Sequence, residues 1–194
     1  MEERDTVQDT FGVFVGRMSP LHYGHQRVIE KMVDRHGRER SLAILGSTNV
    51  PLGPRHFFTF EERLRFFKTV FPEVRVTGLH DLNDDGEWLV LLDEFLKEHV
   101  IDPDKAIFYG GCGEDLTLYA TLGKKKTYVV DRFEDGRPVI SATEIRKLLS
   151  EQKYDELDGL MDERIKEDVI KVFEDRYATL SSNIFVTQHN NEKK

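Results

Sequence analysis

Short apolar runs alternate with amphipathic stretches along most of the chain. The runs have the length of strands and cover residues 11–15, 41–45, 74–77, 106–109 and 127–130. Between them, apolar residues recur at helical spacing over about 28–33, 60–71, 89–96 and 114–122. Strands that alternate with helices of this length predict a parallel sheet with helices on both faces, because parallel crossovers place the helices there.

Capping patterns mark where two of the helices begin. Thr59 is followed by Glu62, and Ser141 by Glu144, at the spacing of a capping box. The second pattern predicts a helix over 143–150, and weaker helical patterns follow at about 155–161 and 165–177. A polar turn at 134–136 precedes that helix.

These elements predict the domain organisation. We expect a Rossmann-like open α/β domain over residues 1–150, with a short helical appendage over 151–180 that packs on it. The polar end of the chain, residues 181–194, is expected to form a mobile tail.

Composition and charge narrow the class of protein. A charged share of 33% and a hydrophobic share of 39% are typical of a globular protein, and no apolar run is long enough to span a bilayer. The acidic, polar N-terminus lacks the features of a secretory signal, so we expect a cytoplasmic protein. A net charge of -8 repels nucleic acid and anionic membranes, so neither is expected as a partner. A phosphorylated ligand would therefore need a local cluster of positive groups.

The segment that joins the first strand to the first helix has the features of such a cluster. It reads GRMSPLHYGH over residues 16–25. A helix N-terminus offers unpaired amides and the positive end of the helix dipole, which attract anions. His22, His25 and Arg17 add donors, and Gly24 leaves room for close approach of a phosphate, with Gly16 upstream of it. The segment predicts a site for a polyphosphate.

Other interpretations of the two histidines stay open at this point. The pattern can arise by chance, as a pair on the surface, or as part of a zinc site. A zinc site needs further ligands, for which His56 and His80 are candidates. The single cysteine, Cys112, has no Cys/His spacing around it that is typical of zinc sites, and we assign no metal ligand.

A second candidate site opens the helix predicted over 143–150. It reads ISATEIR over residues 140–146. A simple N-cap explains Ser141 and Glu144, but not Arg146, because a cation is disfavoured near the positive end of a helix. A phosphate bound by Ser141, Thr143 and Arg146 would reconcile the pattern.

GRMSPLHYGH together with ISATEIR resembles the paired signatures of the HxGH nucleotidyltransferase superfamily. Within it, the chain is most similar to the archaeal-type nicotinamide-mononucleotide (NMN) adenylyltransferases, from about residue 11 to the helix after Arg146. The matching positions are Gly46-Ser47, the R-x-x-F-T-x-x-E-R pattern formed by Arg55, Phe58-Thr59 and Glu62-Arg63, and the pair Asp81 and Trp88.

The resemblance implies a reaction and roles for these residues. The reaction would transfer AMP from ATP, with Mg²⁺, to NMN and form NAD and pyrophosphate. The implied catalytic residues are His22, His25 and Arg146, the implied nucleotide-binding residues are Gly16, Arg17, Gly24, Arg55, Ser141 and Thr143, and the implied acceptor-binding residues are Gly46, Ser47, Asp81 and Trp88. Because related enzymes are often oligomeric, a homo-oligomer also stays open.

Departures from the family pattern keep other functions open. The loop 81–88 is one residue longer, the turn at 110–113 reads GGCG instead of an SGN-like sequence, and Ala142 replaces a common glycine. The acceptor could instead be phosphopantetheine, flavin mononucleotide, or a sugar or polyol phosphate. A nucleotide-sensing module without turnover is a further alternative. Taken without the resemblance, Trp88 would be a packing residue and Arg55 a solvated loop charge.

Overall fold

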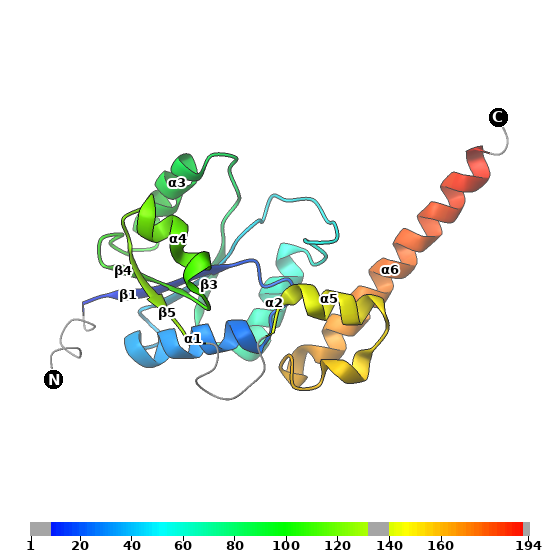
Figure 1. The fold of residues 1–194 in the computed structure, drawn as a ribbon, viewed down its shortest axis with the longest axis horizontal. Coiled ribbons are helices and arrows are strands. Elements are labelled where there is room, and N and C mark those ends of the chain that lie inside the picture. Colours follow the sequence, from blue (N-terminus) through cyan, green and yellow to red (C-terminus); the bar gives the residue numbers. More distant parts are fainter. Residues whose placement is uncertain (1–8, 132–139, 192–194) are drawn as a thin grey trace.

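The computed structural model describes the backbone of residues 9–131 and 140–191, and the side chains of these residues as far as Tyr177. Its centre is one parallel sheet of five strands in the order β3-β2-β1-β4-β5 (Figure 1). The strands are β1 (Phe11–Gly16), β2 (Ser41–Leu45), β3 (Arg75–Gly78), β4 (Ala106–Gly110) and β5 (Lys126–Val129). The predicted Rossmann-like sheet is confirmed. The strand order reverses between β1 and β4, and open sheets of this kind bind ligands beyond the carboxyl ends of the strands at that point.

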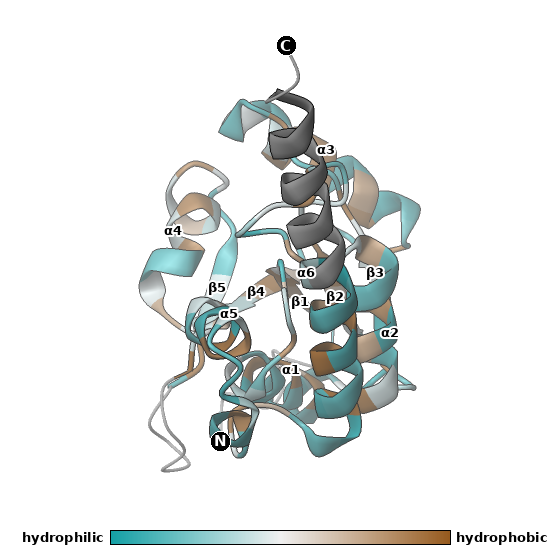
Figure 2. Ribbon diagram, turned by 90° about the vertical axis from the view of Figure 1, so that its right-hand side faces the viewer, coloured by the Kyte–Doolittle hydropathy of each residue, from teal (hydrophilic) through white to brown (hydrophobic). Residues whose placement is uncertain are grey.

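Helices cover both faces of the sheet. They are α1 (Tyr23–His36), α2 (Phe60–Val70), α3 (Asp85–Glu98), α4 (Gly113–Thr121), α5 (Ala142–Ser150), a 3₁₀ turn η1 (Tyr154–Leu157) and α6 (Glu163–Asn191). In Figure 2 the helices carry bands of both hydrophobic and hydrophilic residues, as helices with one buried side do. The predicted capping box at the start of α2 is confirmed in both directions, and Ser141 caps α5 by accepting a hydrogen bond from the Glu144 amide.

Two hydrophobic cores lie on the two faces of the sheet. Successive residues of a strand point to opposite faces, so Val13 belongs to one core and Phe14 to the other. Phe108 and Tyr109 of β4 divide in the same way. Helices α3 and α4 pack in the core of Val13, whereas α1, α2, α5 and α6 pack in the core of Phe14. The described helices thus cover the two faces of the sheet and do not cover the edge formed by the carboxyl ends of its strands.

The C-terminal helices differ from the sequence prediction. The helix expected at about 155–161 is wrong: only Tyr154–Leu157 form a 3₁₀ turn, and the chain then leaves helical geometry through Gly159 at φ 72°. The last helix was expected to end at Tyr177, but α6 continues to Asn191, and residues 178–191 contain no Gly or Pro that would end it. The domain boundaries and the mobility of 181–194 stay predictions, and the turn expected at 134–136 lies outside the described residues.

Side chains in the first half of α6 join this helix to α2 and to the loop before it. Arg65 pairs with Asp168, and Arg176 donates two hydrogen bonds to the Glu62 carboxylate. The Phe57 ring, in the loop before α2, stacks on Phe173 at 4.4 Å between centroids. Within the part of the chain that is described, no helix combines the length and the apolar character needed to cross a membrane.

Candidate active site

A cavity of about 790 Å³ lies at the carboxyl ends of the strands, a size typical of ligand sites. Its wall comes from the segments that follow β1, β2, β3 and β4 and from the start of α5. Every site residue predicted from the sequence lines it: Gly16, Arg17, His22, Gly24, His25, Gly46, Ser47, Arg55, Asp81, Trp88, Ser141, Thr143 and Arg146. The structure thus brings these residues together, and their roles stay predictions.

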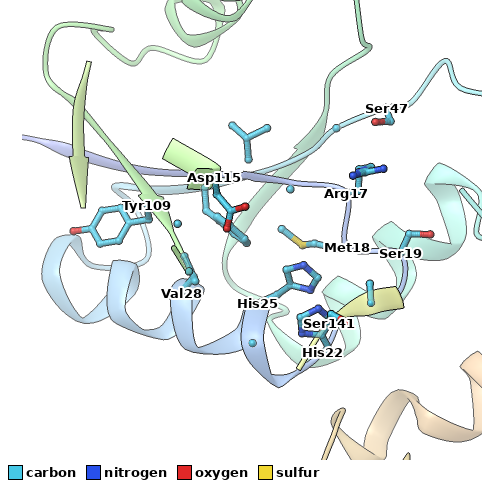
Figure 3. A pocket seen from close by; sticks show the side chains of 18 of the residues that line it. Arg17, Met18, Ser19, His22, His25, Val28, Ser47, Tyr109, Asp115 and Ser141 are labelled. Carbon is cyan, nitrogen blue, oxygen red and sulfur yellow. The ribbon is translucent and has the colours of Figure 1, made fainter. Parts of the chain in front are cut away.

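The two histidines form a stacked pair at the start of α1 (Figure 3). The ring centroids of His22 and His25 lie 3.7 Å apart with 28° between the planes, and His22 is only 5% exposed. Gly24 is needed for this packing, since a Cβ there would come within 2.9 Å of the His22 ring. Gly24 was predicted to leave room for a phosphate, but the group closest to the position of its missing Cβ is this imidazole.

The start of α1 is suited to an anion. Its N-cap, His22, makes no side-chain capping hydrogen bond within the described structure, and the first turn carries no acidic residue. Burial lowers the pKa of His25 to about 3, so this imidazole is neutral at pH 7 and can donate one hydrogen bond. Its Nδ1 atom is buried and meets no hydrogen-bond partner among the described residues. A polar ligand in the cavity could satisfy the histidine and the helix amides together.

Three arginines bring positive charge to the same wall. Arg146 donates hydrogen bonds to the Ser19 carbonyl oxygen at 2.8 Å and to Thr143 Oγ1 at 3.0 Å. Burial, and then the charges of Arg17 and Arg55, lower the pKa of Arg146. The charges of Arg17 and Arg55 thus act unfavourably on Arg146 until an anion binds, so the arrangement favours a polyphosphate in a chain whose net charge is -8.

Another part of the wall is built around a carboxylate. Asp81 accepts hydrogen bonds from the Ser47 amide at 3.1 Å and the Ser47 hydroxyl at 2.6 Å. Asn49 bonds to the Asp81 backbone in both directions, which fixes the loop after β3 to the loop after β2. A Cβ on Gly46 would meet only the Asp81 carboxylate, at 4.0 Å. The geometry leaves Gly46 facing open space beside the carboxylate.

Trp88 lies on this acidic side of the cavity in the first turns of α3. Its ring nitrogen donates to the His80 carbonyl oxygen at 3.2 Å, and its ring centroid is 6.1 Å from that of Tyr119. The side chain is half-buried and contacts the core of Val13 while it lines the cavity. Trp88 therefore packs against the core and lines the cavity at the same time. An aromatic face near a carboxylate suits a flat cationic ring.

The loops after β1 and β2 both contain a residue with left-handed backbone geometry. Met18 has φ 46° and Ser47 has φ 58°. This geometry costs a residue other than glycine about 1–2 kcal/mol, so neighbouring contacts must hold it. Arg63 of α2 supplies such contacts, because its guanidinium donates to the carbonyl oxygens of Arg17 at 2.7 Å and Gly46 at 2.8 Å.

Sequence reasoning missed several residues of the cavity wall. Ser19, Tyr109, Asp115 and Asp131 line it, and His56, considered only as a zinc ligand, lines it as well. All but His56 and Ser19 follow or end β4 and β5, so the rule that ligands bind at the carboxyl ends of strands could have indicated them. His80 is exposed and does not line the cavity. In the described ranges no three His, Cys, Asp or Glu side chains gather as a metal site would require, so the zinc interpretation gains no support.

A known protein family matches the part of the chain that forms this site. Residues 13–148 match the family described as Cytidylyltransferase-like. The chain belongs to the cytidylyltransferase-like family. Because the match spans both the HxGH and the ISATEIR segments, it confirms the resemblance on which the sequence analysis relied.

Similar proteins agree with this family. A nicotinamide-nucleotide adenylyltransferase of Thermococcus sibiricus is 26% identical over 155 residues, 75% of this chain and 77% of that one. Nicotinamide-nucleotide adenylyltransferase 1 of Sulfolobus acidocaldarius is 26% identical over 147 residues, 72% of this chain and 77% of that one. Among solved structures, a bifunctional NMN adenylyltransferase/ADP ribose pyrophosphatase of Francisella tularensis has a TM-score of 0.68 at 17% identity. That likeness covers 93% of this chain but 57% of the bifunctional one, and it supports the fold.

Proposed function

We propose that this protein transfers AMP from ATP to nicotinamide mononucleotide, forming NAD and pyrophosphate. The observation that carries the proposal is that His25 and Arg146, from motifs more than a hundred residues apart, line one cavity together with Asp81 and Trp88. The family supports nucleotidyl transfer as the reaction class, and both archaeal relatives are named for this acceptor. The alternative acceptors remain for experiment to exclude.

The chemistry needs alignment more than acid–base catalysis. An oxygen of the acceptor's 5′-phosphate attacks the α-phosphorus of ATP, a new P–O bond forms, and the bond to the β-phosphate breaks. Pyrophosphate leaves with the electron pair. The attacking phosphate is already ionised at neutral pH, so no group has to remove a proton from it. The protein must therefore hold both substrates in line and stabilise charge on the triphosphate.

The positive end of the cavity would bind the triphosphate. His22 and His25 would donate to the α-phosphate and the leaving pyrophosphate, and the low pKa of His25 suits a neutral donor rather than a proton-transfer group. Arg17, Arg55 and Arg146 would neutralise the neighbouring phosphates, with the Ser141 and Thr143 hydroxyls and the N-terminal amides of α5 beside them.

The acidic end would bind the acceptor. Trp88 offers a ring face and Asp81 a carboxylate to a pyridinium ring. Gly46 and Ser47 would lie along the same acceptor, since Ser47 is tied to Asp81 by two hydrogen bonds. The acceptor's phosphate would then meet the α-phosphate of ATP between these two groups of residues.

A divalent cation fits these residues if ATP carries it. Magnesium keeps several waters and binds phosphate oxygens, so it needs no cluster of protein carboxylates, and none occurs among the described residues. The Francisella tularensis enzyme has also been solved with AMP and a manganese ion, which is consistent with a divalent cation. Bound to the triphosphate, the ion would neutralise its charge while the arginines orient it.

The test is pyrophosphate release with ATP, Mg²⁺ and a panel of acceptors: NMN, phosphopantetheine, flavin mononucleotide and sugar and polyol phosphates. The proposal predicts turnover with NMN well above every other acceptor. Turnover with a different acceptor alone would contradict the substrate assignment, and ATP binding without turnover on any acceptor would favour the sensing alternative. A cytoplasmic location, the use of magnesium and the oligomeric state stay predictions.

A further inference from the structure

Arg63 is a buried cation that does not touch the cavity. It lies on α2, its exposed fraction is 3%, and it is absent from the cavity wall. Burying a guanidinium is costly unless its N–H groups find acceptors. Among the described residues it forms no salt bridge, although the charges of Asp81 and Glu61 attract it, so its hydrogen bonds all go to neutral acceptors.

Its acceptors are all backbone carbonyl oxygens. Nη1 donates to Arg17 at 2.7 Å and to Gly46 at 2.8 Å, and Nη2 donates to Ser47 at 3.4 Å. Nε donates to the Thr59 carbonyl oxygen at 3.3 Å, which anchors the guanidinium to the start of its own helix. One planar side chain therefore bonds to the loop after β1 and to the loop after β2 at once.

These two loops carry residues that the proposed function assigns to different substrates. The Arg17 carbonyl directly precedes Met18, in the segment that leads to the histidine pair. The Ser47 carbonyl belongs to the residue that holds the Asp81 carboxylate. Met18 and Ser47 are also the two cavity residues with left-handed backbone geometry. The hydrogen bonds of Arg63 thus hold each loop at or next to its residue with left-handed geometry.

We propose that Arg63 is a positioning residue for nucleotidyl transfer, which fixes the triphosphate end and the acceptor end of the cavity at the separation that in-line attack requires. This inference rests on the function proposed above. Lysine cannot reproduce these bonds, because its ammonium ends one bond short of Nη1, the nitrogen that bonds to both loops, and it has no counterpart of the nitrogens that bond to Thr59 and Ser47. A misplacement of about 1 Å between reacting groups costs on the order of 100-fold in rate.

The test compares Arg63→Lys with Arg65→Lys. Arg65 is on the same helix, but it is exposed and pairs with Asp168 away from the cavity, so it is a matched control. Steady-state kinetics with ATP and NMN and thermal melting are measured for both variants and for the wild type. For Arg63→Lys we expect kcat to fall at least tenfold, the KM of each substrate to stay within about threefold, and cooperative melting to persist.

Three results for Arg63→Lys would overturn the proposal. The first is a kcat equal to that of Arg65→Lys, and the second is a raised KM for one substrate with kcat unchanged. The third is a fall in kcat no larger than the fall in the fraction of folded protein. If Arg63→Lys does not fold, Arg63→Gln, which removes the buried charge, is judged by the same kcat and KM criteria. Failure of the proposed function is seen separately, because the wild type and Arg65→Lys would then not turn over NMN.

Discussion

The guanidinium of Arg146 donates a hydrogen bond to the carbonyl oxygen of Ser19 over 2.8 Å. Ser19 lies in the loop after β1 and Arg146 in α5, 127 positions later in the chain. This bond joins the two sequence motifs directly, and it orients a side chain whose remaining N–H groups can meet a ligand.

Arg146→Lys is expected to lower turnover about 10- to 100-fold, because lysine keeps the charge but cannot bond to Ser19, Thr143 and a phosphate together. Pyrophosphate release under saturating substrates measures this. The matched control is Lys147→Gln, which alters the adjacent, exposed side chain, whose ion pair within the described part of the chain is with Glu151. Equal turnover of the two variants would contradict a role for Arg146 in the transition state.

Asp81→Asn is expected to raise the KM for the acceptor about tenfold and to leave the KM for ATP within about twofold. Asparagine removes the negative charge beside the proposed cationic ring. Its NH₂ group also takes the place of one of the two carboxylate oxygens that accept hydrogen bonds from Ser47. Separate titration of each substrate measures the two constants. Glu87→Gln, an exposed acid of the same segment outside the cavity wall, should change neither. A larger change in the KM for ATP than in the KM for the acceptor would contradict the assignment of Asp81 to the acceptor.

His25 makes stability depend on pH in a defined direction. Its pKa is about 3 in the folded protein and near 6.5 in the unfolded chain, so below pH 6.5 the unfolded state binds a proton that the folded state does not. Its contribution is therefore complete above pH 6.5 and is lost as the pH falls. Between pH 7 and pH 5 the wild type should lose about 2 kcal/mol more of its unfolding free energy than His25→Asn does.

Urea denaturation at the two pH values measures this difference. His80→Asn is the control, because His80 is an exposed histidine, and it should follow the wild type. Parallel losses in the wild type and in His25→Asn would show that His25 is not buried as described.

The two ion pairs between α2 and α6 should differ in strength. The Arg176 and Glu62 side chains are 18% and 17% exposed, whereas those of Arg65 and Asp168 are 50% and 39% exposed. Burial by itself raises the pKa of Glu62, but the hydrogen bonds from Arg176 and the Thr59 amide outweigh it and lower that pKa. Arg176→Met should therefore cost on the order of 2 kcal/mol of unfolding free energy, and Arg65→Met less than about 1 kcal/mol. Urea denaturation of both variants at pH 7 measures the contrast, and equal costs would contradict it.

The central fold could be predicted because its signals are local. Strand β2 has the bounds predicted from its apolar run, since all five residues are buried, and Thr59 caps α2 through a pattern visible in four consecutive residues. The chain from Tyr154 to Met161 was misread because its apolar residues pack at helical spacing without forming more than one 3₁₀ turn. The length of α6 was underestimated, because the apolar spacing was followed only to Tyr177 and no Gly or Pro ends the helix before Asn191.

The residues of the candidate site that were predicted all stand in a motif. His22 and Arg146 stand in short patterns, so they could be assigned before the cavity was known. Arg63 could not be given a position in the same way, although it belongs to a motif, because its acceptors lie 46 and 17 positions earlier in the chain. The meeting of those carbonyls depends on loop geometry, which periodicity does not reveal.

The most direct test of the account is mass analysis of the product formed by the wild-type protein from ATP, Mg²⁺ and NMN, with pyrophosphate measured in the same reaction. The account predicts NAD and pyrophosphate in equal amounts, and both should nearly vanish in His25→Ala while the variant remains folded. Pyrophosphate without a dinucleotide product, no turnover at all, or full activity in the folded His25→Ala variant would contradict it.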